Sequence, residues 1–335
     1  MLTFKLNNEP TNIQQPIWQQ LKNPIMKRTL RNVILYLVAI PSLFISCQSN
    51  QDKTKLTEKV VEELKEKILN TEEQEIIAVV ENILRAAGNY NIVELDNLTS
   101  DKAVIGYTRI KDGTWKNTEV TINEYFESIK NRELRPFIEI VSDYDIIVTE
   151  EHMALVRADA VVNRFGIPGS REVNHMILIK ENNQWKLLSI GWTAHKQPEE
   201  KRKFDLNIFA QGYAQAWGST RPEFIAMFFE EDGSLTVNNG KPAKGTTAII
   251  NVAQSFMETF PDMIVSMDSL ITKSNKTRFY WTLTGTNDIP NGTGNKVKIS
   301  GFEEWTLNKD GLIQESKGYF DEKEYQRQLE NGTDK

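Results

Sequence analysis

The sequence predicts an α+β protein with two tandem cone-shaped domains, each a curved antiparallel sheet wrapped around helices. In each half of the chain, segments with helical periodicity come first and long segments with strand periodicity follow. That order is typical of α+β folds. Landmark residues of the first half also recur in the second half at a nearly constant spacing of 125–128 residues. The length agrees, because 335 residues correspond to about two domains.

The recurring landmarks indicate a tandem duplication. Chance explains one such match, but four matches in the same order favour two related domains. The interval is too long for a solenoid repeat. A charged linker, Pro198–Arg202, separates predicted domains at 72–197 and 203–331. The matching pairs are Tyr90-Asn91 with Trp217-Gly218, Pro136 with Pro261, Lys180–Asn183 with Asn308–Gly311, and Gly191-Trp192 with Gly318-Tyr319.

The periodicity predicts the individual elements. In the second half, Arg278, Tyr280 and Thr282 alternate with Phe279 and Trp281, as expected for a sheet buried on one face. Helices are predicted at 204–216, 222–229, 246–259 and 322–329, and strands at 234–237, 264–272, 277–286, 296–308 and 312–320. In the first half, helices are predicted at 74–87 and 122–130, and strands at 137–148, 153–165, 171–180 and 185–194.

The N-terminal region has the pattern of an export signal. Lys27, Arg28 and Arg31 precede the apolar run Val33–Ile45. Its 13 residues are too few to span a bilayer, which takes about 20, but they suit a signal peptide. We predict that translation starts at Met26, which makes residues 1–25 a mis-assigned leader and 26–47 the signal peptide. Residues 48–71 are predicted to be a polar tether followed by a charged helix.

The signal segment ends in Phe44-Ile45-Ser46-Cys47, which resembles a bacterial lipobox. The resemblance implies that Cys47 receives a diacylglycerol and becomes the mature N-terminus. It also implies a protein anchored to the membrane of the bacterial cell envelope, periplasmic or on the outer membrane, without spanning it. An ordinary signal peptide that happens to contain Cys47, or a buried core cysteine, are the alternatives.

Composition excludes several classes of protein. One Cys and three His exclude a disulfide framework and a Cys-rich zinc site. The His residues also lack the spacing of metal ligands, so neither a metal nor a cofactor is expected. A net charge of −6 argues against a nucleic-acid partner, which requires neutralised phosphates.

Residues 204–329 resemble the SnoaL-like polyketide cyclase branch of the nuclear-transport-factor-2-like superfamily, which includes ketosteroid isomerase and has a cystatin-like fold. The first half looks like a more distant member, through Leu155–Asp159, Trp185-Lys186 and Gly191–Thr193. The resemblance implies a conical cavity between the sheet and the long helix. In the second half it rests on Tyr213–Trp217, Phe228–Gly233, Lys244-Gly245, Phe256–Pro261, Trp281–Gly285, Asp310–Ile313 and Gly318–Asp321.

The same resemblance suggests catalytic residues. Tyr213 and Glu303 stand where the isomerases place an oxyanion-binding tyrosine and a protonated acid, and Asp321 stands where the cyclases place an acid–base aspartate. No carboxylate occupies the position of the isomerase base, around Thr236–Asn238, so proton abstraction lacks its first group. Asp321 can also be interpreted as the N-cap of a terminal helix. We favour this interpretation over a catalytic role.

Other side chains are candidates for binding a ligand. Arg157, Asp159 and His175 lie on neighbouring predicted strands, and they form a polar cluster in the cavity if their faces coincide. The alternative is an exposed Arg157–Asp159 pair worth little. The aromatic residues proposed to line the cavities are Trp192, Trp217 and Trp281, although filling the core is the commoner role of such rings.

These observations favour a cell-envelope lipoprotein whose two cavity-forming domains bind a small apolar ligand or a partner. Two alternatives stay open. One is a cyclase or isomerase acting on a carbonyl-containing substrate through Asp321, Tyr213 and Glu303. The other is a scaffold or oligomerisation module, which predicts cavities filled by their own side chains.

Overall fold

Each half of the chain folds into a six-stranded sheet, and the two sheets have the same strand order. The computed structural model describes residues 71–130, 133–290 and 292–333. The order is β2-β1-β6-β5-β4-β3 in the first sheet and β8-β7-β12-β11-β10-β9 in the second. Adding six to each strand number of the first sheet reproduces the second. The predicted α+β fold with two tandem domains is therefore confirmed.

The first sheet is made of long strands joined mostly by tight turns. In the turn between β1 and β2, Asp112 and Gly113 have φ of 53° and 74°, the left-handed pair that a two-residue hairpin loop requires. The strands are β1 (Thr99–Lys111), β2 (Thr114–Thr121), β3 (Ile138–Thr149), β4 (Met153–Arg164), β5 (Ile167–Glu181) and β6 (Gln184–Lys196).

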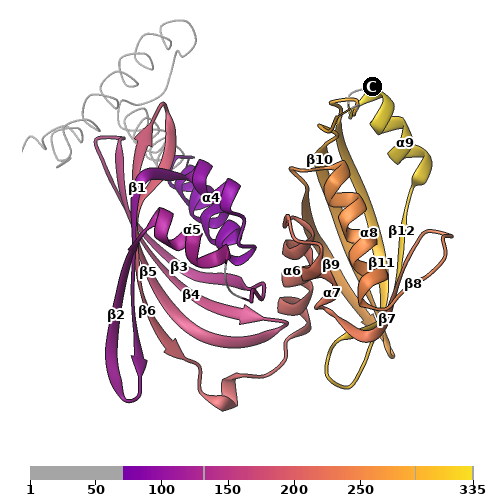
Figure 1. Cartoon of the computed structure of the whole chain (residues 1–335), viewed down its shortest axis with the longest axis horizontal. Coiled ribbons are helices and arrows are strands. Elements are labelled where there is room, and N and C mark those ends of the chain that lie inside the picture. The colour runs from indigo at the N-terminus through magenta and orange to yellow at the C-terminus, as the bar shows by residue number, and fades with distance from the viewer. Residues whose placement is uncertain (1–70, 131–132, 291, 334–335) are drawn as a thin grey trace, which may run out of the picture. The chain divides into compact units, whose positions relative to one another are not determined.

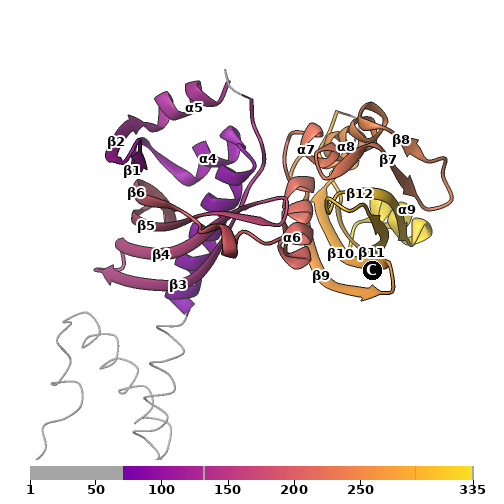
Figure 2. The same cartoon turned by 90° about the horizontal axis from the view of Figure 1, so that it is seen from below.

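Helices cover one face of the first sheet (Figures 1 and 2). Residues 71–88 are helical, and α4 (Ile92–Leu98) and α5 (Ile122–Lys130) follow. Ile76, Val80 and Phe126 from the helices form a core with Val156 and Met176 from β4 and β5. Burial of these apolar side chains is what holds the helices on the sheet.

The second domain repeats this plan. Its strands are β7 (Phe229–Val237), β8 (Ala243–Lys244), β9 (Ile264–Lys273), β10 (Lys276–Thr286), β11 (Lys296–Leu307) and β12 (Ile313–Phe320), and its helices are α6 (Leu206–Trp217), α7 (Glu223–Ala226), α8 (Thr246–Thr259) and α9 (Glu322–Asn331). Figure 1 shows α8 lying along one face of the sheet. The core is aromatic: Phe209 and Tyr213 of α6 pack with Phe228, Phe279 and Trp305.

Two features of the sheets differ from a simple antiparallel meander. In each sheet one neighbouring pair is parallel, β1 with β6 and β7 with β12. Register shifts interrupt several ladders, for example between Val141 and Asp143 of β3 and between Tyr280 and Trp281 of β10. Such irregularities increase the twist and bend the sheet, which gives each sheet its curved inner face (Figure 2).

The sequence analysis missed three elements of the first domain: α4, β1 and β2. The Asp112-Gly113 pair between them is a strong hairpin signal, but the flanking strands carry many polar residues. β2 exposes most of its side chains, so it lacks the apolar alternation that marks a half-buried strand.

The predicted export signal, Cys47 and the predicted tether lie outside the described residues. Within the part of the chain that the structure describes, no helix is long and apolar enough to cross a membrane.

Candidate functional sites

The second domain contains a buried carboxylate that three side chains bind at one oxygen. Glu303 of β11 accepts hydrogen bonds at Oε2 from the hydroxyl of Tyr213 (3.1 Å), the indole N–H of Trp305 (2.9 Å) and the hydroxyl of Ser316 (2.6 Å). Tyr213 lies in the middle of α6, and Ser316 lies on β12 beside β11. The fold therefore brings a helix and two strands together on one carboxyl group.

Burial controls the ionisation of this cluster. Glu303 is 6% exposed and Tyr213 is 0% exposed. Burial raises the pKa of the Glu303 carboxyl, and the three donors oppose that shift because they stabilise the charged form. Burial, followed by the neighbouring Glu303 charge, raises the pKa of Tyr213 well above its usual value. Tyr213 is thus a neutral donor whose proton is already engaged.

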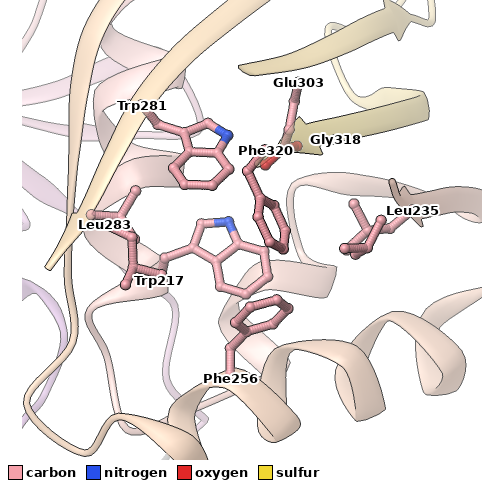
Figure 3. A pocket seen from close by; sticks show the side chains of 10 residues that line it. Trp217, Leu235, Phe256, Trp281, Leu283, Glu303, Gly318 and Phe320 are labelled. Carbon is pink, nitrogen blue, oxygen red and sulfur yellow. The ribbon is translucent and has the colours of Figure 1, made fainter. Parts of the chain in front are cut away.

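A small apolar pocket lies beside Glu303. Figure 3 shows the rings of Trp217, Trp281, Phe256 and Phe320 gathered around it. Its volume is about 50 Å³, which suits a few water-sized groups and not a polycyclic compound. Trp281 lines the pocket, and its indole N–H is buried without a hydrogen-bond partner among the described residues. Trp217 and Trp281 line it as predicted.

The predicted catalytic trio does not assemble. Tyr213 and Glu303 meet, but the Tyr213 hydroxyl is bound to Glu303 and Tyr213 is not among the residues that line the pocket. Asp321 is exposed and caps α9, where its carboxylate accepts from the backbone N–H groups of Lys323 (3.0 Å) and Glu324 (3.1 Å). The placement of Asp321 with the other two is therefore corrected, and the helix-cap interpretation agrees with the geometry.

The position expected for a base carries a structural amide instead. Asn238 follows β7, and its side-chain oxygen accepts from the backbone N–H of Phe320 at 3.0 Å. Val237 lines the pocket. Among the residues that line this pocket, Glu303 is the only carboxylate.

The first domain contains a much larger cavity, of about 490 Å³. It lies between the inner face of β3–β6 and the helices, with residues of β1 and β2 along one side. Trp192 lines it, as predicted, and its ring stacks on Tyr107 with a centroid distance of 5.0 Å. The other apolar lining side chains include Ile83, Leu84, Tyr90, Phe137, Val162 and Ile190.

Two carboxylates line this cavity where β3, β4 and β5 run side by side. Glu139 of β3 accepts from the amide of Asn174 at 3.1 Å, and Glu172 of β5 accepts from the hydroxyl of Ser170 at 2.9 Å. Burial, then the Glu172 charge, raises the pKa of Glu139 to about 8, against the opposing effects of Asn174 and Arg164. Burial also raises the pKa of Glu172. A group poised near neutral pH in a cavity marks a candidate functional site.

Arg157, Asp159 and His175 lie on the other face of the sheet. Arg157 and His175 are paired across β4 and β5, His175 is exposed, and Asp159 forms ion pairs with Arg157 and Arg171. The prediction that these three line the cavity is wrong. On β4 the side chains that point inward are those at alternate positions to Arg157 and Asp159. They are all buried: Ala154, Val156, Ala158, Ala160 and Val162.

The sequence analysis missed Glu139, Glu172 and Asn174. A signal for two of them was present, because successive residues of a strand point to opposite faces. Met176 and Leu178 are apolar and fully buried, and counting back in steps of two places Asn174 and Glu172 on their face. The prediction instead assigned the face that carries Val173, His175 and Ile177 to the cavity. That is the opposite face of the strand.

Comparison with known proteins assigns the second domain. Residues 207–329 match the family model of the SnoaL-like polyketide cyclases, so this part of the chain is a SnoaL-like domain. The first domain shares its strand order and is a second domain of the same topology. No curated protein matches the chain.

Several solved structures are similar at low identity. A putative polyketide cyclase from Bacillus cereus is 21% identical, with 40% of this chain and 85% of that chain covered and a TM-score of 0.32. A putative SnoaL-like polyketide cyclase from Jannaschia sp. is 16% identical over 32% of this chain and 78% of that chain, with a TM-score of 0.30. A phenazine biosynthesis-related protein from Pseudomonas aeruginosa is 15% identical over 38% and 90%, with a TM-score of 0.31.

Proposed function

We propose that this protein binds a small organic molecule in the cavity of its first domain, and that the SnoaL-like domain is not the main binding site. The supporting observation is the contrast between the two cavities. The first, at about 490 Å³, lies within the range of about 300–1,000 Å³ that is usual for ligand sites. The second, at about 50 Å³, is nearly filled by its own aromatic side chains.

A cavity-filling variant tests this proposal. Ala194 of β6 lines the cavity and pairs with Glu172, so Ala194→Phe places a ring inside. Thr193→Phe is the matched control, because the neighbouring residue on a strand points to the other face. The probe is the neutral fluorophore N-phenyl-1-naphthylamine. We expect it to bind the parent protein and Thr193→Phe, but not Ala194→Phe. Absence of binding to the parent protein, or equal binding to Ala194→Phe, would contradict the proposal.

A cyclase or isomerase reaction in the second domain is the other candidate function. It is favoured by Glu303 and Trp281 lining one pocket, since a carboxyl can move a proton and an N–H can bind a carbonyl oxygen. Conversion of 3-cyclohexenone to 2-cyclohexenone, followed by ultraviolet absorbance, is a test scaled to a small pocket. Turnover that disappears in Glu303→Gln and persists in the neighbouring control Glu304→Gln, a partly exposed carboxylate paired with Arg278, supports this candidate. A rate equal to buffer rejects it for this substrate class.

We further propose that the protein is a lipoprotein of the bacterial cell envelope, anchored through Cys47. The proposal rests on the sequence pattern of residues 26–47, which lie outside the described part of the structure. Cys47→Ser is expected to move the protein from the membrane fraction to the soluble fraction, while Ser49→Ala leaves it membrane-bound. Mass spectrometry of the native N-terminus is expected to find a lipid-modified Cys47. A mature chain that retains Trp18 contradicts both the anchor and the Met26 start.

A further inference from the structure

The carboxylates of the first-domain cavity indicate what kind of ligand it takes. We propose that the ligand is an organic cation, such as a protonated amine on an apolar body, and that Glu139 and Glu172 bind its charged end. This inference rests on the proposed binding function and adds the chemical class of the ligand.

The two carboxylates come from strands on either side of β4. Glu139 of β3 pairs with Val162 of β4, and Val162 pairs with Ser170 of β5. Ser170 bonds Glu172 and Asn174 bonds Glu139, so two neutral side chains hold the carboxylates in place. Both carboxylates line the same cavity. Among the described residues, neither has an ion pair with Lys, Arg or His.

The charges around this end of the cavity leave an acidic excess. Arg164 of β4 is the nearby cation; it lines the cavity with the two carboxylates and lowers the pKa of both. Its guanidinium, however, lies over the ring of Phe137, 5.2 Å from the centroid. Tyr144 of β3, near Glu139 but not among the lining residues, has a buried hydroxyl with no hydrogen-bond partner among the described residues. Burial, and then the charges of Glu81 and Glu139, raise its pKa. A bound cation supplies the counter-charge that two desolvated carboxylates lack.

The rest of the cavity suits an apolar or aromatic body. The stacked rings of Trp192 and Tyr107 line it, and aromatic faces attract cations as well as apolar groups. Arg109 and Glu124 line the cavity too. Arg109 lies over the ring of Tyr107, 5.6 Å from its centroid, and Glu124 is bonded to Thr121. An anionic group at this end of the cavity would meet Glu139 and Glu172 as well as Arg164, which makes an anion the disfavoured class.

Three molecules of one shape and different charge test the inference. They are 1-naphthylmethylamine, which is cationic, 1-naphthylmethanol, which is neutral, and 1-naphthoate, which is anionic. Each is titrated directly into the full protein by calorimetry at pH about 8.5, which is above the pKa of Glu139 and below that of the amine. We expect the amine to bind at least about tenfold more tightly than the alcohol, because hydrogen bonds between charged groups are stronger than those of neutral ones. We expect the carboxylate to bind weakest.

Variants locate the preference. In Glu139→Gln/Glu172→Gln the advantage of the amine over the alcohol is expected to disappear while the alcohol retains its affinity. Glu127→Gln, an exposed change on α5, is the matched control and is expected to keep the advantage. Circular dichroism and the retained binding of the alcohol show that the double variant is folded.

The outcomes separate this inference from the proposed function. If the three molecules bind with equal affinity, or if the anion binds best, the cavity binds ligands but the cation inference is overturned. If the preference for the amine survives in the double variant, Glu139 and Glu172 are not its source, and the inference is again overturned. If none of the three binds, both the inference and the proposed function fail for ligands of this size.

Discussion

The hydroxyl of Tyr213 donates a 3.1 Å hydrogen bond to Oε2 of Glu303, and both side chains are buried in the core of the SnoaL-like domain. The sequence resemblance predicted that these two residues would take the roles of the oxyanion-binding tyrosine and acid of the isomerases. Here the donor is used within the protein, together with donors from Trp305 and Ser316. The arrangement stabilises a buried carboxyl group, and the Tyr213 hydroxyl proton is already engaged by it.

Tyr213→Phe tests whether this hydrogen bond is structural. The change removes one of three donors to a buried carboxylate, so we expect a loss of about 1–3 kcal/mol in the free energy of unfolding. Tyr319→Phe, at an exposed tyrosine, is the control and should change stability little. Urea denaturation measures both variants. Unchanged stability in Tyr213→Phe would argue that the hydroxyl is available for another role.

Asp321→Ala tests the assignment of Asp321 as a helix cap. Loss of the two hydrogen bonds to Lys323 N and Glu324 N is expected to cost about 1 kcal/mol of stability. Asp321→Asn keeps an acceptor oxygen and should recover most of the loss, whereas an acid–base role would be lost in both variants. Thermal denaturation distinguishes them. An Asn variant as unstable as the Ala variant would count against the cap.

Gly301→Ala tests the close packing beside the second pocket. A Cβ at Gly301 would lie 2.5 Å from the carbonyl oxygen of Tyr319 and 2.7 Å from the ring of Trp281. The ring or the strand has to move, and we expect a loss of about 1–3 kcal/mol. At Gly191 the nearest atom is 3.7 Å away, so Gly191→Ala is a matched control with a small effect. Near-ultraviolet circular dichroism should report the displaced indole only in Gly301→Ala.

Glu139→Gln tests the ionisation of the first cavity. The folded-state pKa of Glu139, about 8, is above its ordinary value of 4.5. Between these values the folded state binds more protons than the unfolded state, so this group makes stability fall as the pH rises. Glu139→Gln should therefore be more stable than the parent protein at pH about 8, by about 2 kcal/mol after screening by cavity water.

The same comparison below pH about 4 should show almost no difference, because Glu139 is then protonated in both the folded and the unfolded state. Denaturation at both pH values measures the effect. Three other ionisable side chains interact electrostatically with Glu139 and are unchanged in the variant: Glu172 of β5, Arg164 of β4 and Tyr144 of β3. A stability difference that does not depend on pH would show that Glu139 is ionised in the usual way.

The elements with regular periodicity were predictable from the sequence, and those set by turns and pairing were not. The predicted helices at 122–130 and 246–259 coincide with α5 and α8, because each buries one regular apolar face. β2 escaped prediction because its pairing with β1 and the Asp112-Gly113 turn define it, while most of its side chains are exposed. A hairpin whose side chains are mostly exposed lacks the apolar alternation that the prediction relied on.

The match between Gly191-Trp192 and Gly318-Tyr319 shows how the phase of a strand escapes the sequence. Each dipeptide is on the strand that comes last in the sequence of its domain, β6 or β12. Trp192 nevertheless lines its cavity, whereas Tyr319 is 38% exposed and Gly318 faces the pocket. A shift of one residue exchanges the two faces of a strand, so the correspondence identifies the strands without aligning their faces.

By itself, the sequence determined the α+β class, the duplication and the family of the second half, because periodicity, spacing and residue strings are properties of the chain. It also carried the export pattern ending at Cys47. The tertiary structure decided which side chains share a cavity. It separated Asp321 from Tyr213 and Glu303, turned His175 outward, and gathered Glu139 and Glu172 around Val162 of β4. The physical reason is that strand phase, bulges and the filling of a cavity arise only when distant segments pack together.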